Sequence, residues 1–137
     1  MIRGEVQGAS SVIAGLRRRD AEIDRAVVRA MAQGAKGGEG IMKGKASGPP
    51  GPYVRSGDFR RSIVGQVVST RGGVVVFQVG SNAPQARRLE YGFVGPDVLG
   101  RVYNQAPRPY AAPSLQPTVD LTVELLRREL ASAIGAA

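Results

Sequence analysis

The sequence contains no cysteine, no histidine and no tryptophan among its 137 residues. Without cysteine the chain has neither disulfides nor a thiolate nucleophile, and without both cysteine and histidine it lacks the usual ligands of a zinc site. The missing imidazole also removes the commonest general base of soluble enzymes. These absences argue against a catalytic role and predict a protein that needs no cofactor and no metal.

Aromatic residues are also scarce, at 5% of the chain. No apolar run approaches the roughly 20 residues that a membrane helix needs. The first residues, Met1 to Glu5, lack the apolar stretch of a signal peptide. We therefore expect a soluble chain made in a cytoplasm, and the length matches a single domain over residues 1–137.

Basic residues exceed acidic residues by 19 to 11, which gives a net charge of +8. Residues 1–61 hold 12 basic and 6 acidic residues and residues 62–137 hold 7 and 5, so most of the excess lies in the first part. Such an excess favours contact with polyanions or with acidic protein surfaces. Because aromatic residues are not interleaved with the basic ones, any contact with nucleic acid is expected at backbone phosphates rather than at bases.

Apolar residues spaced three and four apart predict two amphipathic helices. The first covers residues 10–33 with Gly34 as its C-terminal stop, and the second runs from Leu115 onward with Pro117 in its first turn. Residues 34–52 carry three prolines and three lysines among many glycines. That composition predicts a long, extended basic loop that reaches a neighbouring subunit.

Alternating β-branched residues over 63–79, interrupted by the glycine-rich segment 70–73, predict a β-hairpin. A short helix is expected over 85–91, ended by Gly92 in a left-handed conformation, and a short strand over 101–103. Together with the two long helices, these elements indicate an α+β fold. An antiparallel sheet built on the hairpin packs against the N- and C-terminal helices, and the sheet, loops and C-terminal helix occupy residues 53–137.

Two carboxylates, Glu90 and Asp97, lie closest to the glycine-rich centre of the chain. Acid–base chemistry by this pair would need a pocket, and the sequence around them gives no sign of one. A structural role fits Glu90 better, as an acceptor of hydrogen bonds from a neighbouring arginine that fixes a loop. The candidate donors are Arg87, Arg88 and Arg108.

Three segments follow one another in a recognisable order. They are Pro52–Ile63 (PYVRSGDFRRSI), Leu89–Gly92 (LEYG) and Pro107–Leu115 (PRPYAAPSL). In this order, between two helices, they resemble the tail-completion or neck family of long-tailed bacteriophages, and the resemblance covers roughly residues 50–120.

The resemblance implies a non-enzymatic structural protein of the virion neck or tail, or its equivalent in a phage-derived particle, made in the host cytoplasm. It implies a homo-oligomeric ring, a hexamer, that joins the head connector or stopper above to the tail tube or terminator below. DNA passes through the channel without sequence-specific contact, and no membrane is involved. A tail terminator at the same junction remains an alternative, as does a cytoplasmic basic module that binds nucleic acid non-specifically.

Contacts with subunits and partners are predicted mainly at charged and aromatic residues of the loop and of the three segments. Gly57 is expected at a turn that only glycine tolerates, and Tyr110 is expected to act as an apolar anchor. The predicted contact residues are Lys36, Met42, Lys43, Lys45, Tyr53, Arg55, Arg60, Arg61, Glu90, Tyr91, Arg108 and Tyr110.

Overall fold

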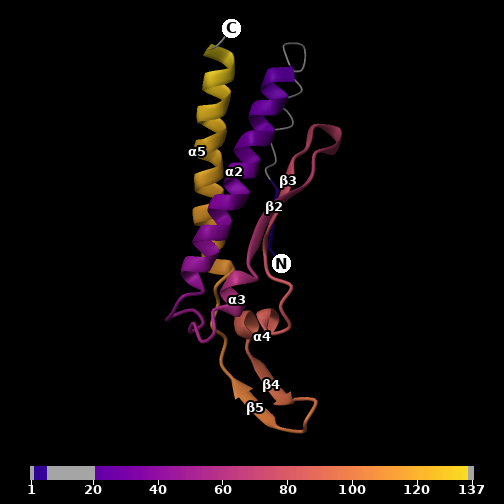
Figure 1. Ribbon diagram of the computed structural model, residues 1–137, viewed down its shortest axis with the longest axis vertical. Helices are drawn as coiled ribbons and strands as arrows, with labels where there is room; N and C mark the ends of the chain where they lie inside the picture. The colour runs from indigo at the N-terminus through magenta and orange to yellow at the C-terminus, as the bar shows by residue number, and fades with distance from the viewer. Residues whose placement is uncertain (1, 6–20, 136–137) are drawn as a thin grey trace.

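The computed structural model describes residues 2–5 and 21–135 of the chain (Figure 1). The predicted start of the first helix, residues 10–20, lies outside the described residues. In chain order the elements are β1 (Ile2–Glu5), α2 (Ala21–Lys45), α3 (Asp58–Arg61), β2 (Val64–Ser69), a 3₁₀ turn (Arg71–Gly73), β3 (Val76–Gly80), α4 (Ala86–Tyr91), β4 (Phe93–Pro96), β5 (Val102–Gln105) and α5 (Ala112–Gly135).

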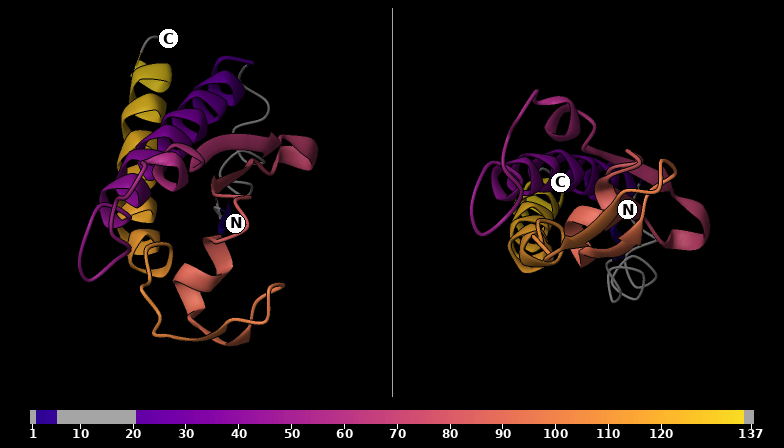
Figure 2. Two further views of the ribbon diagram at one scale, coloured as in Figure 1. Left: turned by 60° about the horizontal axis from the view of Figure 1, so that its bottom comes forward. Right: turned by 90° about the horizontal axis from the view of Figure 1, so that it is seen from below.

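Helix α2 lies between α5 and a three-stranded antiparallel sheet, so the body of the molecule has three layers (Figures 1 and 2). The strand order of this sheet is β1-β3-β2. β2 and β3 form the predicted 63–79 hairpin, with Val64 opposite Gly80, and β1 adds a strand that the sequence did not predict. The predicted α+β fold is therefore confirmed. A second, two-stranded sheet of β4 and β5 extends from one end of the body (Figure 1).

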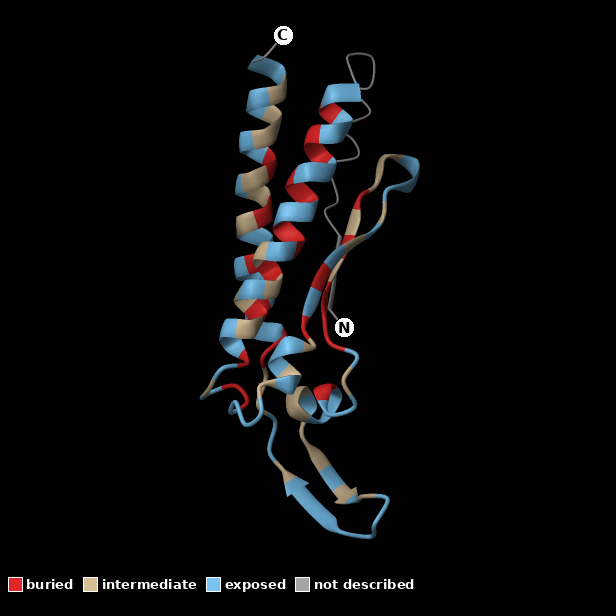
Figure 3. Ribbon diagram, in the orientation of Figure 1, coloured by how far each residue is buried: buried red, intermediate tan, exposed pale blue. Residues whose placement is uncertain are grey.

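The core follows the apolar stripe of α2, which is buried along its length (Figure 3). Val27 and Met31 from this stripe pack with Phe77 of β3, with Ile63 just before β2 and with Leu126 of α5. Full burial of a side chain of this size stabilises the fold by about 1.5–3 kcal/mol. The three layers are therefore joined by one continuous core.

The predicted basic loop over residues 34–52 is wrong for most of its length, because α2 continues through Gly34 to Lys45. Residues 46–52 do lack helix and strand, as predicted, and this irregular segment continues to Gly57. Glycine in a helix interior costs about 1 kcal/mol relative to alanine, so tertiary contacts must hold this part of α2 in helical form.

Close packing of α2 against its neighbours supplies those contacts. A Cβ on Gly34 would lie 2.5 Å from Oγ1 of Thr122, and one on Gly38 would lie 2.6 Å from Cγ2 of Thr118 and 3.0 Å from Cγ2 of Val79. Gly34 and Gly38 stand four residues apart and so share one face of the helix. Glycine at these two positions lets α2 approach α5 this closely. The buried contact offsets the loss of helix stability that glycine causes relative to alanine.

Helix α5 begins at Ala112, three residues before the predicted start, so Pro117 lies inside the helix rather than in its first turn. Pro113 fits near the N-terminus because a proline there leaves no unpaired N–H. The predicted short helix and short strand are confirmed as α4 and β5. Gly92 ends α4 with a positive φ of 75°, but its ψ of 175° lies outside the predicted left-handed region.

Candidate partner-binding surface

Glu90 holds the N-terminus of α5 in place. The prediction that Glu90 accepts hydrogen bonds from an arginine is wrong. Its carboxylate accepts hydrogen bonds from the backbone N–H groups of Tyr110 and Ala111, both at 2.9 Å from Oε2, and of Ala112, at 3.0 Å from Oε1. A negative charge at a helix N-terminus is favourable both as a cap and through the helix dipole. Glu90 therefore joins α4 to α5, which is a structural role within the chain.

Tyr110 is the predicted apolar anchor, and the structure confirms that it is buried. Its ring packs edge-on against Phe59, with ring centroids 5.0 Å apart, and its hydroxyl donates to the carbonyl oxygen of Ala86 at 3.3 Å. Burial, assisted by the charge of Glu90, raises the pKa of Tyr110 to about 12. Tyr110 thus stays neutral and belongs to the core, not to an outer contact surface.

Two of the predicted basic contacts are engaged by Glu39 on the same helix. The Glu39 carboxylate accepts from Nζ of Lys43 at 2.7 Å, from the backbone N–H of Gly65 at 2.9 Å and from Nζ of Lys36 at 3.1 Å. The hydrogen bond from Lys43, followed by that from Gly65, lowers the pKa of Glu39 to about 2. This cluster ties α2 to the edge strand β2. Met42, predicted as a contact, is buried in the core.

Four other predicted residues come together around one cleft of about 960 Å³. They are Tyr53, Arg55, Arg60 and Arg108. The cleft lies between the 46–57 segment, α3, α4 and β5, and no carboxylate is among the described residues that line it. The guanidinium of Arg108 sits 4.7 Å from the centre of the Tyr53 ring, which is a cation–π contact.

The arginines at the cleft differ in how far they are neutralised. Arg61, just outside it, pairs with Asp58, whereas the structure gives Arg55 and Arg60 no ion pair among the described residues. Both are exposed. Lys45 is likewise exposed and without an ion pair in the described part of the chain. Gly57, with a φ of 81°, adopts the left-handed turn that was predicted for it and leads the chain into α3.

The β4–β5 hairpin is a second exposed feature, and the sequence analysis missed it. Four of its apolar side chains are at least 73% exposed: Val94, Val98, Leu99 and Val102. Asp97 shapes the turn, accepting from the backbone N–H groups of Leu99 and Arg101, both at 2.9 Å, and from Nε of Arg101 at 2.7 Å. Figure 3 shows no buried segment in this hairpin, which is coloured as intermediate or exposed throughout.

A signal for this hairpin does exist in the sequence. Pro96 and Asp97 are followed by Gly100, and such turn residues between β-branched residues are typical of a hairpin loop. Asp97 and Glu90, considered above as an acid pair, each hold a different backbone segment. Tyr91, another predicted contact, is exposed on α4 beside a smaller hollow that Arg87 and Asn82 also line.

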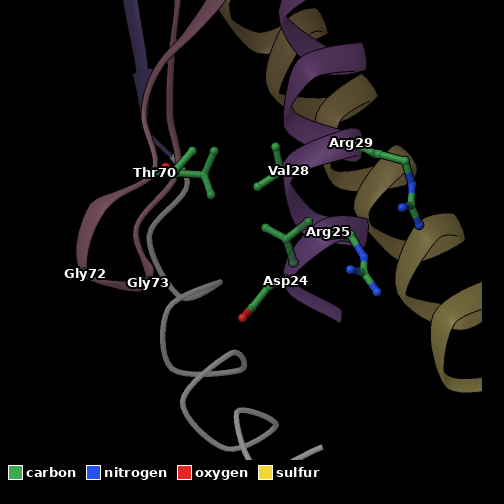
Figure 4. Close-up of a pocket in the computed structure, with 9 residues that line it drawn as sticks. Asp24, Arg25, Val28, Arg29, Thr70, Gly72 and Gly73 are labelled. Atoms are coloured by element: carbon green, nitrogen blue, oxygen red, sulfur yellow. The ribbon is translucent and has the colours of Figure 1, made fainter. Parts of the chain in front are cut away.

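A further hollow, of about 590 Å³, lies between the start of α2 and the β2–β3 turn (Figure 4). Its lining is mainly apolar, and Asp24 is the one carboxylate among the described residues that line it. Arg25 and Arg29 border it but pair elsewhere, with Glu22 at 2.6 Å and with Glu129 at 3.2 Å. A single carboxylate without a partner base offers no acid–base pair.

Residues 10–92 match the family described as "Bacteriophage HK97-gp10, putative tail-component". The chain belongs to the HK97-gp10-like family. The matched range includes α2, the β2–β3 hairpin and α4, while β4, β5 and α5 lie beyond it. This membership makes the protein a structural component of phage tails and places it in the virion, with other virion proteins as its neighbours.

Searches of the curated proteins and of the solved structures find no match for the chain. Within residues 2–5 and 21–135, no three histidine, cysteine or carboxylate side chains cluster in a way that could hold a metal ion. No helix in the same described part is both long and apolar enough to cross a membrane. The cleft and the β4–β5 hairpin are accordingly the two surfaces on which a functional proposal rests.

Proposed function

We propose that this protein is a neck or tail-completion subunit that forms a ring, as a hexamer, and joins the head connector to the tail around the DNA channel. The ring meets the connector or stopper on one side and the tail tube or terminator on the other, and it acts without catalysis. Membership of a family of tail components supports the general role.

The observation that carries the proposal is the exposed β4–β5 hairpin. Soluble monomers rarely leave a contiguous set of large apolar side chains uncovered, and such patches mark sites of protein contact. A two-stranded hairpin is also marginally stable unless it packs against other structure. Val98, at the turn, is fully exposed. A hairpin of this kind is suited to a joining protein, which must contact several neighbours in a larger assembly.

The test is an assembly assay in the phage or phage-derived particle that encodes this chain. A null strain is complemented with the wild-type gene or with the double variant Val98→Ser and Leu99→Ser, and lysates are examined by electron microscopy. We expect the variant to give DNA-filled heads beside unattached tails of normal length. Joined particles in normal yield would contradict the proposal. Tails of irregular length would instead indicate a terminator, because a terminator ends the growth of the tube.

A nucleic-acid module is the second candidate, and it is favoured by Arg55 and Arg60, which line the cleft without an ion pair among the described residues. Binding to phosphates falls with salt, at about one logarithmic unit of slope per phosphate contacted. Titration of the isolated protein with duplex DNA at several salt concentrations separates the two candidates. The neck proposal predicts no tight, salt-sensitive binding, whereas a nucleic-acid module predicts a steep slope that Arg60→Glu reduces.

A further inference from the structure

The lining of the basic cleft combines positive charge with apolar side chains. Arg55 and Arg60 stand at the cleft without an ion pair in the described part of the chain, and Arg108 stacks on Tyr53. The apolar lining consists of Ala46, Val54, Phe59, Leu89 and Ala106. Arginine and tyrosine next to apolar side chains are characteristic of protein–protein interfaces. A carboxylate-bearing segment with apolar side chains therefore fits this cleft better than a duplex, whose phosphates need a longer row of cations.

The first half of α5 carries the complementary chemistry. Residues 109–126 contain no lysine or arginine, and their acidic residues are Asp120 and Glu124. Gln116, Asp120 and Glu124 recur every four residues and so form one line along the helix. We call these three residues the acidic line; all three are exposed.

Apolar side chains run beside the acidic line. Leu115 and Val119, one position before Gln116 and Asp120, are both exposed and form a parallel row. Asp120 accepts a hydrogen bond from Gln116 at 2.9 Å and has no ion pair among the described residues, whereas Glu124 lies 3.5 Å from Arg128. This face of α5 thus offers a carboxylate and an apolar row together, which is what the cleft requires.

The two surfaces do not meet within one chain. The residues that line the cleft come from the 46–57 segment, α3, α4, β5 and the residues just after β5, and none comes from α5. The opposite side of α5, with Thr118 and Thr122, packs on α2 instead. The acidic line can therefore reach such a cleft only on another copy.

We propose that the acidic line of one copy docks into the basic cleft of the next copy. This inference rests on the proposed ring function and names the contact that builds the ring. The contact is heterologous, because two different surfaces meet, so each copy keeps one free cleft and one free acidic line for further neighbours. Repetition closes a ring when the rotation between copies closes. Local attraction of opposite charges also offsets the repulsion expected between copies that each carry a net charge of +8.

The absence of cysteine makes a cross-linking test direct, because introduced cysteines are the sole thiols in the chain. Asn104→Cys places a thiol in the cleft lining, and Gln116→Cys places one on the acidic line. Purified particles containing the double variant are treated with a short bismaleimide and examined by denaturing gel electrophoresis. A head-to-tail contact gives a ladder of covalent multimers larger than dimers. Each single variant gives dimers at most.

A matched control combines Asn104→Cys with Ser132→Cys. Ser132 is also exposed on α5 but lies two turns beyond the acidic line. This pair is expected to give no ladder. A ladder from both double variants would mean that cross-linking reports crowding rather than docking, and it would overturn the proposal.

Charge reversal tests whether the attraction is specific. Arg60→Glu and Asp120→Lys are each expected to lower the yield of the ladder about tenfold, since reversal replaces attraction by repulsion at the same contact. The two substitutions together are expected to restore it. Arg71→Glu, an equal charge change at the β2–β3 turn, serves as the control and should leave the ladder unchanged. If the combined variant gives as little ladder as each single variant, the proposed pairing is contradicted.

These experiments distinguish a failure of the docking inference from a failure of the proposed function. If the protein is present in purified particles but gives no ladder, the docking inference fails while the proposed function stands. If the protein is absent from particles, the proposed function fails and the inference fails with it. If Arg60→Glu abolishes salt-dependent binding to duplex DNA and leaves the ladder unchanged, the cleft is a nucleic-acid site and the inference is wrong.

Discussion

The two ends of this molecule differ in how closely their side chains pack against the rest of the chain. In the body, α2 is held so closely between α5 and the sheet that a single added carbon atom at Gly34 or Gly38 would overlap a neighbour. At the other end, the β4–β5 hairpin leaves most of its apolar side chains in solvent. The apolar side chains of the body are buried by contacts within the chain, whereas side chains of the hairpin and of the basic cleft remain exposed. Under the proposed function, stability and assembly therefore depend on separate residues, which can be altered separately.

The largest expected effect comes from breaking the close contact in the body. Gly34→Val adds side-chain atoms where even a Cβ would lie 2.5 Å from Oγ1 of the fully buried Thr122. Overpacking of this kind is expected to lower the free energy of unfolding by about 3 kcal/mol. Denaturant titration measures it. Gly40→Val is the matched control, because no atom lies within 4 Å of a Cβ built there, and we expect a change within about 0.5 kcal/mol.

The cluster around Glu39 predicts a dependence of body stability on pH. The pKa of Glu39 is about 2 in the folded protein against an ordinary value of 4.5, so the ionised carboxylate stabilises the fold. This contribution is complete above about pH 5.5, and it is lost as the pH falls through 4.5 toward 2. Its size is on the order of 2 kcal/mol.

Urea titration between pH 2 and pH 6 measures this contribution as the difference between wild type and Glu39→Gln. The two proteins should converge in stability at low pH and diverge as the pH rises. A difference that stayed constant over this range would show that Glu39 acts by packing rather than by its charge.

The junction between body and far end depends on Glu90. Glu90→Ala leaves the backbone N–H groups of Tyr110, Ala111 and Ala112 without their acceptor. Loss of a cap of this kind is expected to lower the free energy of unfolding by about 1–2 kcal/mol. Thermal unfolding followed by circular dichroism measures it. Glu124→Ala removes an exposed carboxylate of α5, and its effect should stay within about 0.5 kcal/mol.

The smallest expected effect on stability belongs to the hairpin. Val98→Ser with Leu99→Ser changes side chains that make little internal contact, so the free energy of unfolding should change by less than about 0.5 kcal/mol. The same variant is expected to block the joining of heads and tails. Ile134→Ser, at an exposed apolar position near the end of α5, should affect neither property. A hairpin variant that unfolds the body would contradict the separation of the two regions.

Periodicity in the sequence predicted the two long helices and the β2–β3 hairpin of the body, but it predicted neither β1 nor the extension of α2 to Lys45. Spacings of three and four indicated the helices, and the alternating β-branched residues over 63–79 indicated the hairpin of β2 and β3. Packing over long distances in the chain was not predictable in the same way. The glycines of residues 34–45 favour a loop by composition alone, whereas in the structure Gly34, Gly37 and Gly38 of this stretch pack closely against α5 as part of α2. The four-residue spacing of Gly34 and Gly38 was the available signal for this contact.

The candidate site was predictable only in part, for a related reason. Tyr53, Arg55, Arg60 and Arg108 do meet at one cleft, although Arg108 is distant in sequence from the other three. Composition could not distinguish Arg55 and Arg60, which have no ion pair among the described residues, from basic side chains that pair within the chain. Pairing depends on which residues the fold brings together. Glu90 was expected to bind an arginine, but the fold brings the backbone at the start of α5 to its carboxylate instead.

The central claim, that exposed surfaces of this tail component are completed by other copies and other virion proteins, is tested most directly by electron cryo-microscopy of the particle that contains it. The account predicts a closed ring at the head–tail junction, with the β4–β5 hairpin of each copy buried against a neighbouring protein. A particle that lacks the protein, or a ring in which the hairpins remain in solvent, would contradict it.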